Sequence, residues 1–210
     1  MNLQSVPIRI LCVDDHPFMR EGIAAYIHKA SDMELVAEAV NGREAIEQFR
    51  KTQPDVTLMD LRLPDISGVE ALRAIRKEFA HARVIILSTF DGDADIQRAL
   101  EAGAQAYLLK TMPRSELLET IRKVHSGQRH VPPEVAAQLM QHLGQAHLSK
   151  REIEVMEKLT EGNRNIDIAS ALFISEETVK GHIKRIMEKL GANDRTEAVA
   201  IALRRGIIKL

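Results

Sequence analysis

Three aspartates, a lysine and a serine stand where they could handle a phosphoryl group. Asp14 and Asp15 follow one apolar run of the sequence, and Asp60, Ser88 and Lys110 each lie at the end of another. Clustered carboxylates repel each other unless a cation lies among them, and an oxygen-rich set without His or Cys favours Mg²⁺. The set would supply an oxygen nucleophile, metal ligands, a cation and a hydrogen-bond donor.

Each of these residues alone has an ordinary structural explanation. An aspartate at the end of a strand is more often a turn residue or a helix cap than a ligand. A lone lysine such as Lys110 is usually a solvated surface residue. The joint pattern is more informative, because all of these side chains fall at corresponding ends of successive apolar runs.

Five short apolar runs and the amphipathic segments after them must position this chemistry. The runs are rich in Val, Ile and Leu, which is typical of strands buried on both faces; they are Ile8–Val13, Leu35–Val40, Val56–Met59, Val84–Leu87 and Ala106–Leu109. The helix-like segments are Pro17–Lys29, Arg43–Lys51, Gly68–Phe79, Asp93–Ala102 and Pro113–Ser126. The alternation predicts an α/β fold with a doubly wound five-stranded parallel sheet, which places functional groups at the carboxyl ends of its strands.

The C-terminal part of the chain shows helical patterns and no strand pattern. We expect four helices there, at Lys150–Glu161, Ile166–Leu172, Glu176–Leu190 and Arg195–Arg205, with N-caps at Ser149, Ser175 and Asp194. Short helices with tight connections predict an all-α helix-turn-helix domain. We place the first domain at residues 1–126, a linker at 127–146, in which Glu134–Leu143 could form a short helix, and the second domain at 147–210.

The third of these helices carries two lysines on one face. Lys180 and Lys184 are four residues apart near the helix start, where a recognition helix meets the major groove. Gly181 has no side chain, so the floor of the groove can approach the helix there. On charge alone, a surface helix with solvated lysines explains the pattern better. Residues 147–210 hold 12 Lys and Arg against 10 Asp and Glu (net +2), and the remaining residues hold 17 against 20 (net −3).

Motifs in the first 126 residues resemble the receiver domain of bacterial response regulators. They are Val13–His16, Met59–Pro64 with Gly68, Leu87–Thr89 and Tyr107–Lys110, and the match spans residues 8–126. The resemblance implies a flavodoxin-like sheet and makes Asp60 the phosphoacceptor. It also implies that Asp14, Asp15, Asp60 and the backbone carbonyl of Arg62 bind Mg²⁺.

The same resemblance assigns three further roles in the receiver. Lys110 would contact the phosphoryl oxygens, Ser88 would be the switch hydroxyl, and Tyr107 would change rotamer when the switch closes. The implied phosphate donor is a sensor histidine kinase, and phosphorylation would favour a homodimer.

Motifs of the second domain resemble the LuxR-type DNA-binding domain. They are Leu148–Glu152, Ile168-Ala169, Ser175–Ile183 and Lys189–Arg195. Together with the receiver, the whole chain resembles a response regulator of the NarL/FixJ family, which regulates transcription by binding double-stranded DNA. By that resemblance the residues facing DNA are Thr178, Lys180, Gly181 and Lys184.

Several function classes are disfavoured by the sequence. A phosphatase of the haloacid-dehalogenase type needs a second Asp two residues after its nucleophile, where this chain has Arg62, so we expect no enzyme. A constitutive DNA binder whose receiver only dimerises stays open as an alternative. The absence of Trp argues against stacking on single strands, and the single Cys excludes internal disulfides. With no apolar run near the ~20 residues of a membrane span and no secretory signal pattern, we expect a cytoplasmic protein.

Overall fold

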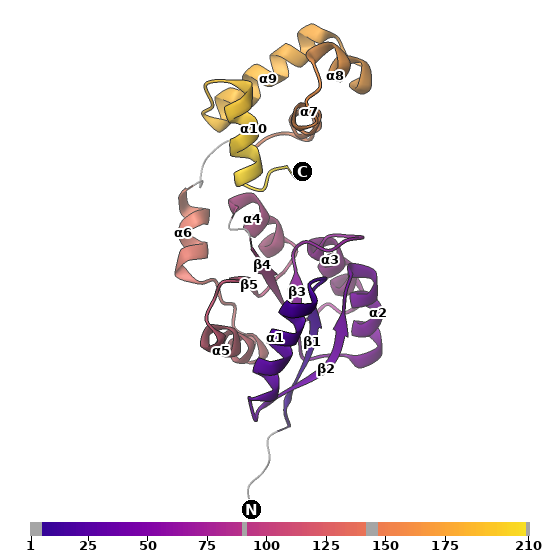
Figure 1. Cartoon of the computed structure of the whole chain (residues 1–210), viewed down its shortest axis with the longest axis vertical. Helices are drawn as coiled ribbons and strands as arrows, with labels where there is room; N and C mark the ends of the chain where they lie inside the picture. Colours follow the sequence, from indigo (N-terminus) through magenta and orange to yellow (C-terminus); the bar gives the residue numbers. More distant parts are fainter. Residues whose placement is uncertain (1–5, 90–91, 142–146, 209–210) are drawn as a thin grey trace, which may run out of the picture. The chain divides into compact units, whose positions relative to one another are not determined.

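The structure, a computed structural model, describes residues 6–89, 92–141 and 147–208. The chain divides into two compact units, one formed by residues 1–91 and 96–137 and the other by 92–95 and 138–210. Figure 1 shows a sheet-containing unit and an all-helical unit. Residues 142–146, the end of the predicted linker, and the ends of the two predicted domains at 1–5 and 209–210 lie outside the described residues. The boundaries at 126 and 147 stay predictions.

The first unit is built on the predicted parallel sheet. Its strands are β1 (Ile8–Val13), β2 (Met33–Ala39), β3 (Val56–Asp60), β4 (Val84–Ser88) and β5 (Ala106–Leu109). They pair in the order β2-β1-β3-β4-β5, each pair parallel. This is the flavodoxin-like order, so the predicted fold class is confirmed, and the carboxyl ends of β1, β3, β4 and β5 share one edge.

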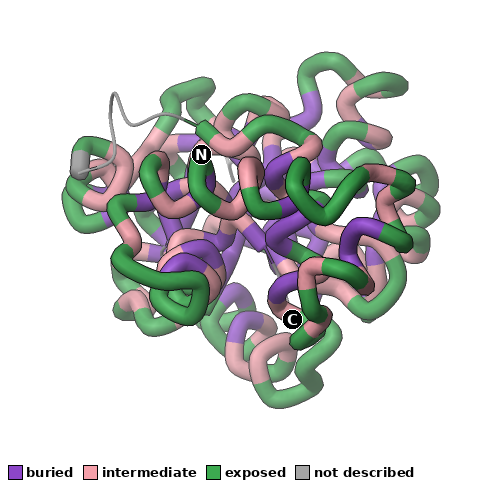
Figure 2. Tube along the Cα trace, turned by 90° about the horizontal axis from the view of Figure 1, so that it is seen from above, coloured by how far each residue is buried: buried purple, intermediate pink, exposed green. Residues whose placement is uncertain are grey.

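Helices cover both faces of this sheet (Figure 1). They are α1 (Pro17–His28), α2 (Gly42–Thr52), α3 (Gly68–Glu78), α4 (Asp93–Glu101) and α5 (Arg114–His125). Apolar side chains of α1 and α5 pack with alternate residues of the strands in one cluster that includes Cys12. On the other face α2 packs beside α3, where the rings of Phe49 and Phe79 lie 5.1 Å apart. All residues of β3 and β4 are buried, as expected for strands covered on both sides. Figure 2 shows buried segments in purple among exposed segments in green.

Local sequence explains where the helices that follow the strands of the site begin. Pro17 begins α1, where its missing N–H costs no helical hydrogen bond. Ser67 caps α3 in a reciprocal capping box with Glu70. The fifth helix was expected to begin at Pro113, but Pro113 has extended backbone and serves as the N-cap of α5. The other helix and strand ends either agree with prediction or differ from it by at most two residues.

The second unit contains the four predicted helices. They are α7 (Lys150–Thr160), α8 (Asn165–Leu172), α9 (Glu176–Leu190) and α10 (Arg195–Arg204), around an apolar core that includes Val155, Ile168, Val179 and Ile186. Ser149, Ser175 and Asp194 cap their helices as predicted. The short helix expected in the linker is α6 (Pro133–Gln141). Within the described residues, no helix has both the length and the apolar character that crossing a bilayer requires.

Candidate functional site

The predicted phosphoryl-handling side chains meet at the carboxyl edge of the sheet. Asp14 directly follows β1, Asp60 is the last residue of β3, and Lys110 directly follows β5. The Lys110 Nζ atom lies 2.7 Å from Asp14 Oδ2 and 2.8 Å from Asp60 Oδ2. Side chains from three strands separated by as many as 96 positions along the chain therefore form one ion-paired cluster.

Burial controls the protonation of this cluster. Asp14 and Asp60 are 0% and 3% exposed, and the Lys110 side chain is 6% exposed. Burial raises the pKa of Asp60 and the nearby Asp14 charge adds to the effect, so the pKa stays above its usual value although Lys110 opposes the shift. Burial works to lower the pKa of Lys110, but its bonds to Asp14 and Asp60 outweigh it and raise that pKa. Lys110 is consequently a firmly charged ammonium at neutral pH.

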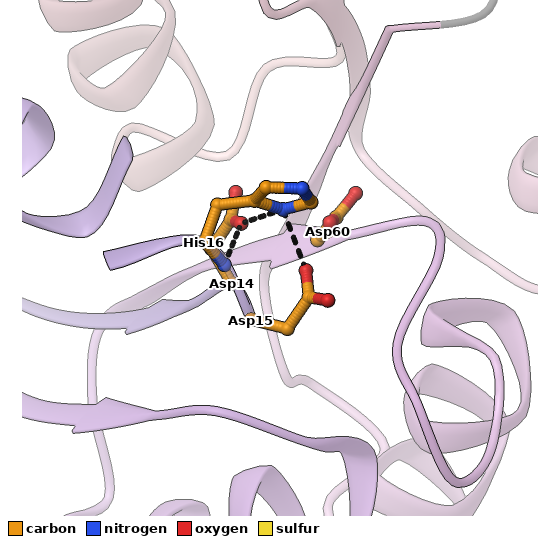
Figure 3. Close-up of side chains that lie close together, drawn as sticks. All are labelled: Asp14, Asp15, His16 and Asp60. Carbon is orange, nitrogen blue, oxygen red and sulfur yellow. Dashed lines mark hydrogen bonds and ion pairs between the residues drawn. The ribbon is translucent and has the colours of Figure 1, made fainter. Parts of the chain in front are cut away.

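Asp15 and His16 extend the cluster toward solvent. Ligand atoms of Asp14, Asp15, His16 and Asp60 all lie within 4.8 Å of one another (Figure 3). The His16 Nδ1 atom is 2.7 Å from Asp15 Oδ1 and 3.2 Å from Asp14 Oδ1. Three gathered carboxylates provide the hard oxygen donors that Mg²⁺ prefers, so the residues present fit that ion. The structure thus brings together the three carboxylates predicted to bind Mg²⁺, with the imidazole of His16 beside them. Their role as metal ligands stays a prediction.

The loop after Asp60 keeps close contact with that residue. The Arg62 N–H group donates to Asp60 Oδ1 at 3.3 Å, and the Gly68 N–H group donates to the Leu61 carbonyl at 3.0 Å. A Cβ atom at Gly68 would lie 2.0 Å from the Asp60 carbonyl oxygen, so only glycine permits this approach. Whether the Arg62 carbonyl binds metal stays a prediction.

Ser88 and Tyr107 are both buried, at 1% and 0% exposure. The Ser88 carbonyl accepts a hydrogen bond from the Lys110 N–H group at 2.7 Å, which joins the ends of β4 and β5 beside the pocket. Tyr107 lies in β5, paired with Ile86 of β4. Ser88 therefore ends its strand at the same edge as Asp60, and Tyr107 is fully buried in the edge strand β5. The switch roles of both residues stay predictions.

Contacts of Asp14 include one residue that sequence reasoning missed. Arg20, in α1, donates from Nη1 to the Asp14 backbone carbonyl at 2.7 Å and pairs with Glu38 of β2 at 3.2 Å. Its helical position carries no sequence signal of this role. His16 did have a signal, because it directly follows the two aspartates in the receiver-like motif.

The candidate DNA-contacting residues lie on the outer face of α9. Thr178, Lys180 and Lys184 are exposed, and a Cβ atom on Gly181 would meet only Arg185, at 4.0 Å. The two lysine side chains are 54% and 77% exposed. Lys180 lies 3.3 Å from Glu176, and Lys184 lies 4.0 Å from Glu188, separations at which exposed pairs contribute little stability.

A partly buried ion pair joins α9 to α7. Lys189 Nζ lies 2.7 Å from Glu152 Oε2 and also donates to the His147 carbonyl at 3.1 Å. Burial alone would raise the pKa of Glu152, but Lys189 and Ser149 outweigh that effect and hold the pKa below its usual value. Separation by 37 positions hid this pair from sequence reasoning.

Comparisons with known proteins match both units. The model of the response regulator receiver domain matches residues 10–122, and that of the bacterial regulatory proteins of the luxR family matches residues 146–202. The response regulator protein VraR of Staphylococcus saprophyticus is 36% identical over 97% of this chain and 100% of its own length.

Two solved structures show the same architecture. The response regulator ChrA of a heme-sensing two-component system is 38% identical, covering 96% of this chain and 99% of ChrA, with a TM-score of 0.59. RcsB of Salmonella enterica serovar Typhimurium, bound to promoter DNA, is 23% identical, covering 92% of this chain and 97% of RcsB, with a TM-score of 0.73. The RcsB likeness bears on the fold alone.

Proposed function

Because the chain belongs to the response regulators that join a receiver domain to a LuxR-type DNA-binding domain, we propose that a sensor histidine kinase phosphorylates Asp60 and thereby controls transcription. The single observation that carries this proposal is the buried cluster in which Lys110 forms ion pairs with both Asp60 and Asp14. A phosphoryl group on Asp60 would find a cation already 2.8 Å from the acceptor carboxylate.

The reaction itself needs few protein groups. An Asp60 carboxylate oxygen attacks phosphorus, the bond from phosphorus to the kinase histidine nitrogen breaks, and an acyl phosphate remains on Asp60. Lys110 holds the attacking carboxylate in place and stabilises negative charge on the phosphoryl oxygens. Burial raises the pKa of Asp60, yet its hydrogen bonds from Lys110 and Arg62 favour the ionised form that must attack.

Three carboxylates fit a divalent cation at this pocket. Asp14, Asp15 and Asp60, with the carbonyl of Arg62, would hold Mg²⁺. The bound ion would neutralise the gathered carboxylates and the phosphoryl oxygens. His16 sits between the carboxylates in its present rotamer, and its 71% exposure leaves it free to turn outward.

Phosphorylation acts through the elements that end at the pocket. A new dianionic group at Asp60 adds charge beside Lys110 and attracts the hydroxyl of Ser88. Tyr107 then changes rotamer, and the altered receiver surface favours a homodimer. Two copies of the second domain can bind two DNA half-sites about one helical turn apart.

The second domain is the proposed reader of double-stranded DNA. In this proposal Thr178, Lys180, Gly181 and Lys184 face the major groove, and the pairs that Lys180 and Lys184 make with glutamates give way to contacts with DNA. The protein acts in the cytoplasm as a regulator and not as a metabolic enzyme.

The test is phosphate incorporation from acetyl phosphate, with Mg²⁺ present, followed by phosphate-affinity electrophoresis. We expect Asp60→Asn to abolish the shifted band while its circular dichroism spectrum stays that of the parent. Asp55→Asn is the matched control, because Asp55 precedes β3 at the opposite end of the strand. Undiminished incorporation in Asp60→Asn would refute the acceptor assignment.

A further inference from the structure

One carboxylate ties the loop after Asp60 to the start of a neighbouring helix. Asp65 Oδ1 accepts the N–H group of Gly42 at 2.7 Å, and its Oδ2 accepts the N–H group of Arg43 at 3.0 Å. These two residues begin α2, and the first N–H groups of a helix have no partner inside the helix. Asp65 therefore bonds α2 from a segment 22 to 23 positions further along the chain.

Helix α2 already has a cap of its own. The Asn41 side chain accepts the N–H group of Glu44 at 2.9 Å, and Glu44 Oε2 in return accepts the N–H group of Val40 at 2.8 Å. Asn41 thus caps α2 in the usual way, and Glu44 bonds the residue before the cap, both without any help from the loop. The two bonds from Asp65 are additional, and what they add is a connection between α2 and the loop.

Packing reinforces the same connection. A Cβ atom on Gly42 would lie 2.5 Å from Ile66 Cγ1 and 3.0 Å from the Ile66 carbonyl, so the glycine lets the loop approach. Burial works to raise the pKa of Asp65, but N–H groups of Ile66, Gly42 and Arg43 outweigh it and lower that pKa. Asp65 is consequently an ionised acceptor at neutral pH.

The loop is fixed at its other end beside the pocket, where the Arg62 N–H group donates to Asp60 Oδ1 at 3.3 Å. We propose that Asp65 is a positioning residue for the divalent-metal site, because it holds the loop so that the Arg62 backbone stays at one place beside Asp60. This inference rests on the proposed function, in which that backbone supplies a metal ligand. Partners that orient metal ligands typically change metal affinity 10- to 100-fold when removed.

The experiment measures Mn²⁺ binding to the full chain by electron paramagnetic resonance, with Mg²⁺ as competitor. We expect Asp65→Ala to weaken Mn²⁺ binding roughly tenfold. Asp65→Asn keeps one oxygen acceptor and should lose less affinity than Asp65→Ala. Gly42→Ala moves the same loop from the other side, by displacing Ile66, and should also weaken binding.

Asp55→Ala is the matched control. Asp55 Oδ2 accepts the Arg9 N–H group at 2.9 Å, which is the same kind of bond at the far end of β3. We expect this variant to bind Mn²⁺ as the parent does. A second readout is the rate of phosphorylation by acetyl phosphate. Asp65→Ala should raise the metal concentration that gives half the maximal rate, and at saturating metal the rate should equal that of the parent.

Parent-like Mn²⁺ affinity in Asp65→Ala, or an equal loss in Asp55→Ala, would overturn the inference. So would a lower maximal rate with unchanged metal affinity. If Asp65→Ala does not fold, Asp65→Asn and Gly42→Ala decide by the same criteria. If the parent chain binds no divalent cation at all, the proposed metal site fails and the role of Asp65 fails with it.

Discussion

Replacing Lys110 by methionine removes the only charge of the side chain and keeps most of its length. In the parent, the ammonium lies within 2.8 Å of a carboxylate oxygen of both Asp14 and Asp60. The variant leaves two buried carboxylates side by side without that ammonium between them. Its stability therefore measures how much the receiver depends on this cation.

The expected loss follows from burial and protonation. Removing one partner of a buried ion pair costs roughly 3–5 kcal/mol. Asp60 can relieve part of that cost by taking up a proton, because burial already raises its pKa. We therefore expect the free energy of unfolding to fall by about 3 kcal/mol at about pH 8 without divalent ions.

The loss should depend on pH with a definite sign. Lys110 opposes the rise in the Asp60 pKa, so its removal leaves that pKa higher in the variant than in the parent. The native variant therefore binds more protons than the native parent over the pH range between the two pKa values, and the loss of stability grows as pH rises through that range. Lowering the pH toward the pKa that Asp60 has in the unfolded chain should therefore recover stability, with a slope of up to about 1.4 kcal/mol per pH unit. Millimolar Mg²⁺ should also recover stability, because it restores positive charge among the carboxylates.

Urea unfolding of the full chain can report on the receiver alone. The chain has two tyrosines and no tryptophan, and both tyrosines, Tyr26 and Tyr107, lie in the first unit. Tyrosine fluorescence therefore follows unfolding of that unit. Parent-like stability of Lys110→Met without metal, or a loss that does not change with pH, would refute the reasoning.

Three further predictions concern other parts of the chain. Replacing Lys180 and Lys184 by glutamine should weaken DNA binding and reduce the slope of log affinity against log salt by roughly two, whereas Lys158→Gln should leave the slope unchanged; fluorescence anisotropy would measure both. Glu152→Gln should cost the second unit roughly 1–3 kcal/mol at neutral pH. Because the pKa of Glu152 is lowered, this contribution is present above about pH 4.5 and lost below it, so parent and variant should converge in acid denaturation followed by circular dichroism. Burial raises the pKa of Cys12 to about 12, with help from Asp14 and Glu38, so Ellman's reagent should label it only as fast as the receiver opens.

The fold was readable from the sequence because each local signal agreed with the global one. Unbroken apolar runs such as Val84–Leu87 identified strands covered on both faces, and Ser149, Ser175 and Asp194 marked helix starts that the structure confirms. Pro113 shows the limit of such signals. A proline suits either the first helical position or the position just before it, and the backbone angles alone decide between them.

The pocket was predictable where side chains end successive strands, since topology brings those ends together. Contacts that depend on how far a side chain reaches were not predictable. Arg20 bonds the backbone of Asp14 from a helix face, and Asp65 bonds α2 from a loop. Both look like ordinary surface residues in the sequence, because nothing in local spacing records which distant segment they touch.

The position of Lys110 in the chain has a consequence for synthesis. The ribosome makes Asp14 and Asp60 before Lys110, and 50 residues separate Asp60 from its ammonium partner. A nascent receiver that has completed only β1 and β3 therefore carries adjoining carboxylates without this counter-charge. Stable closure of the sheet should wait until β5 and the residue after it have left the exit tunnel, so the receiver should fold late, as a whole, rather than strand by strand.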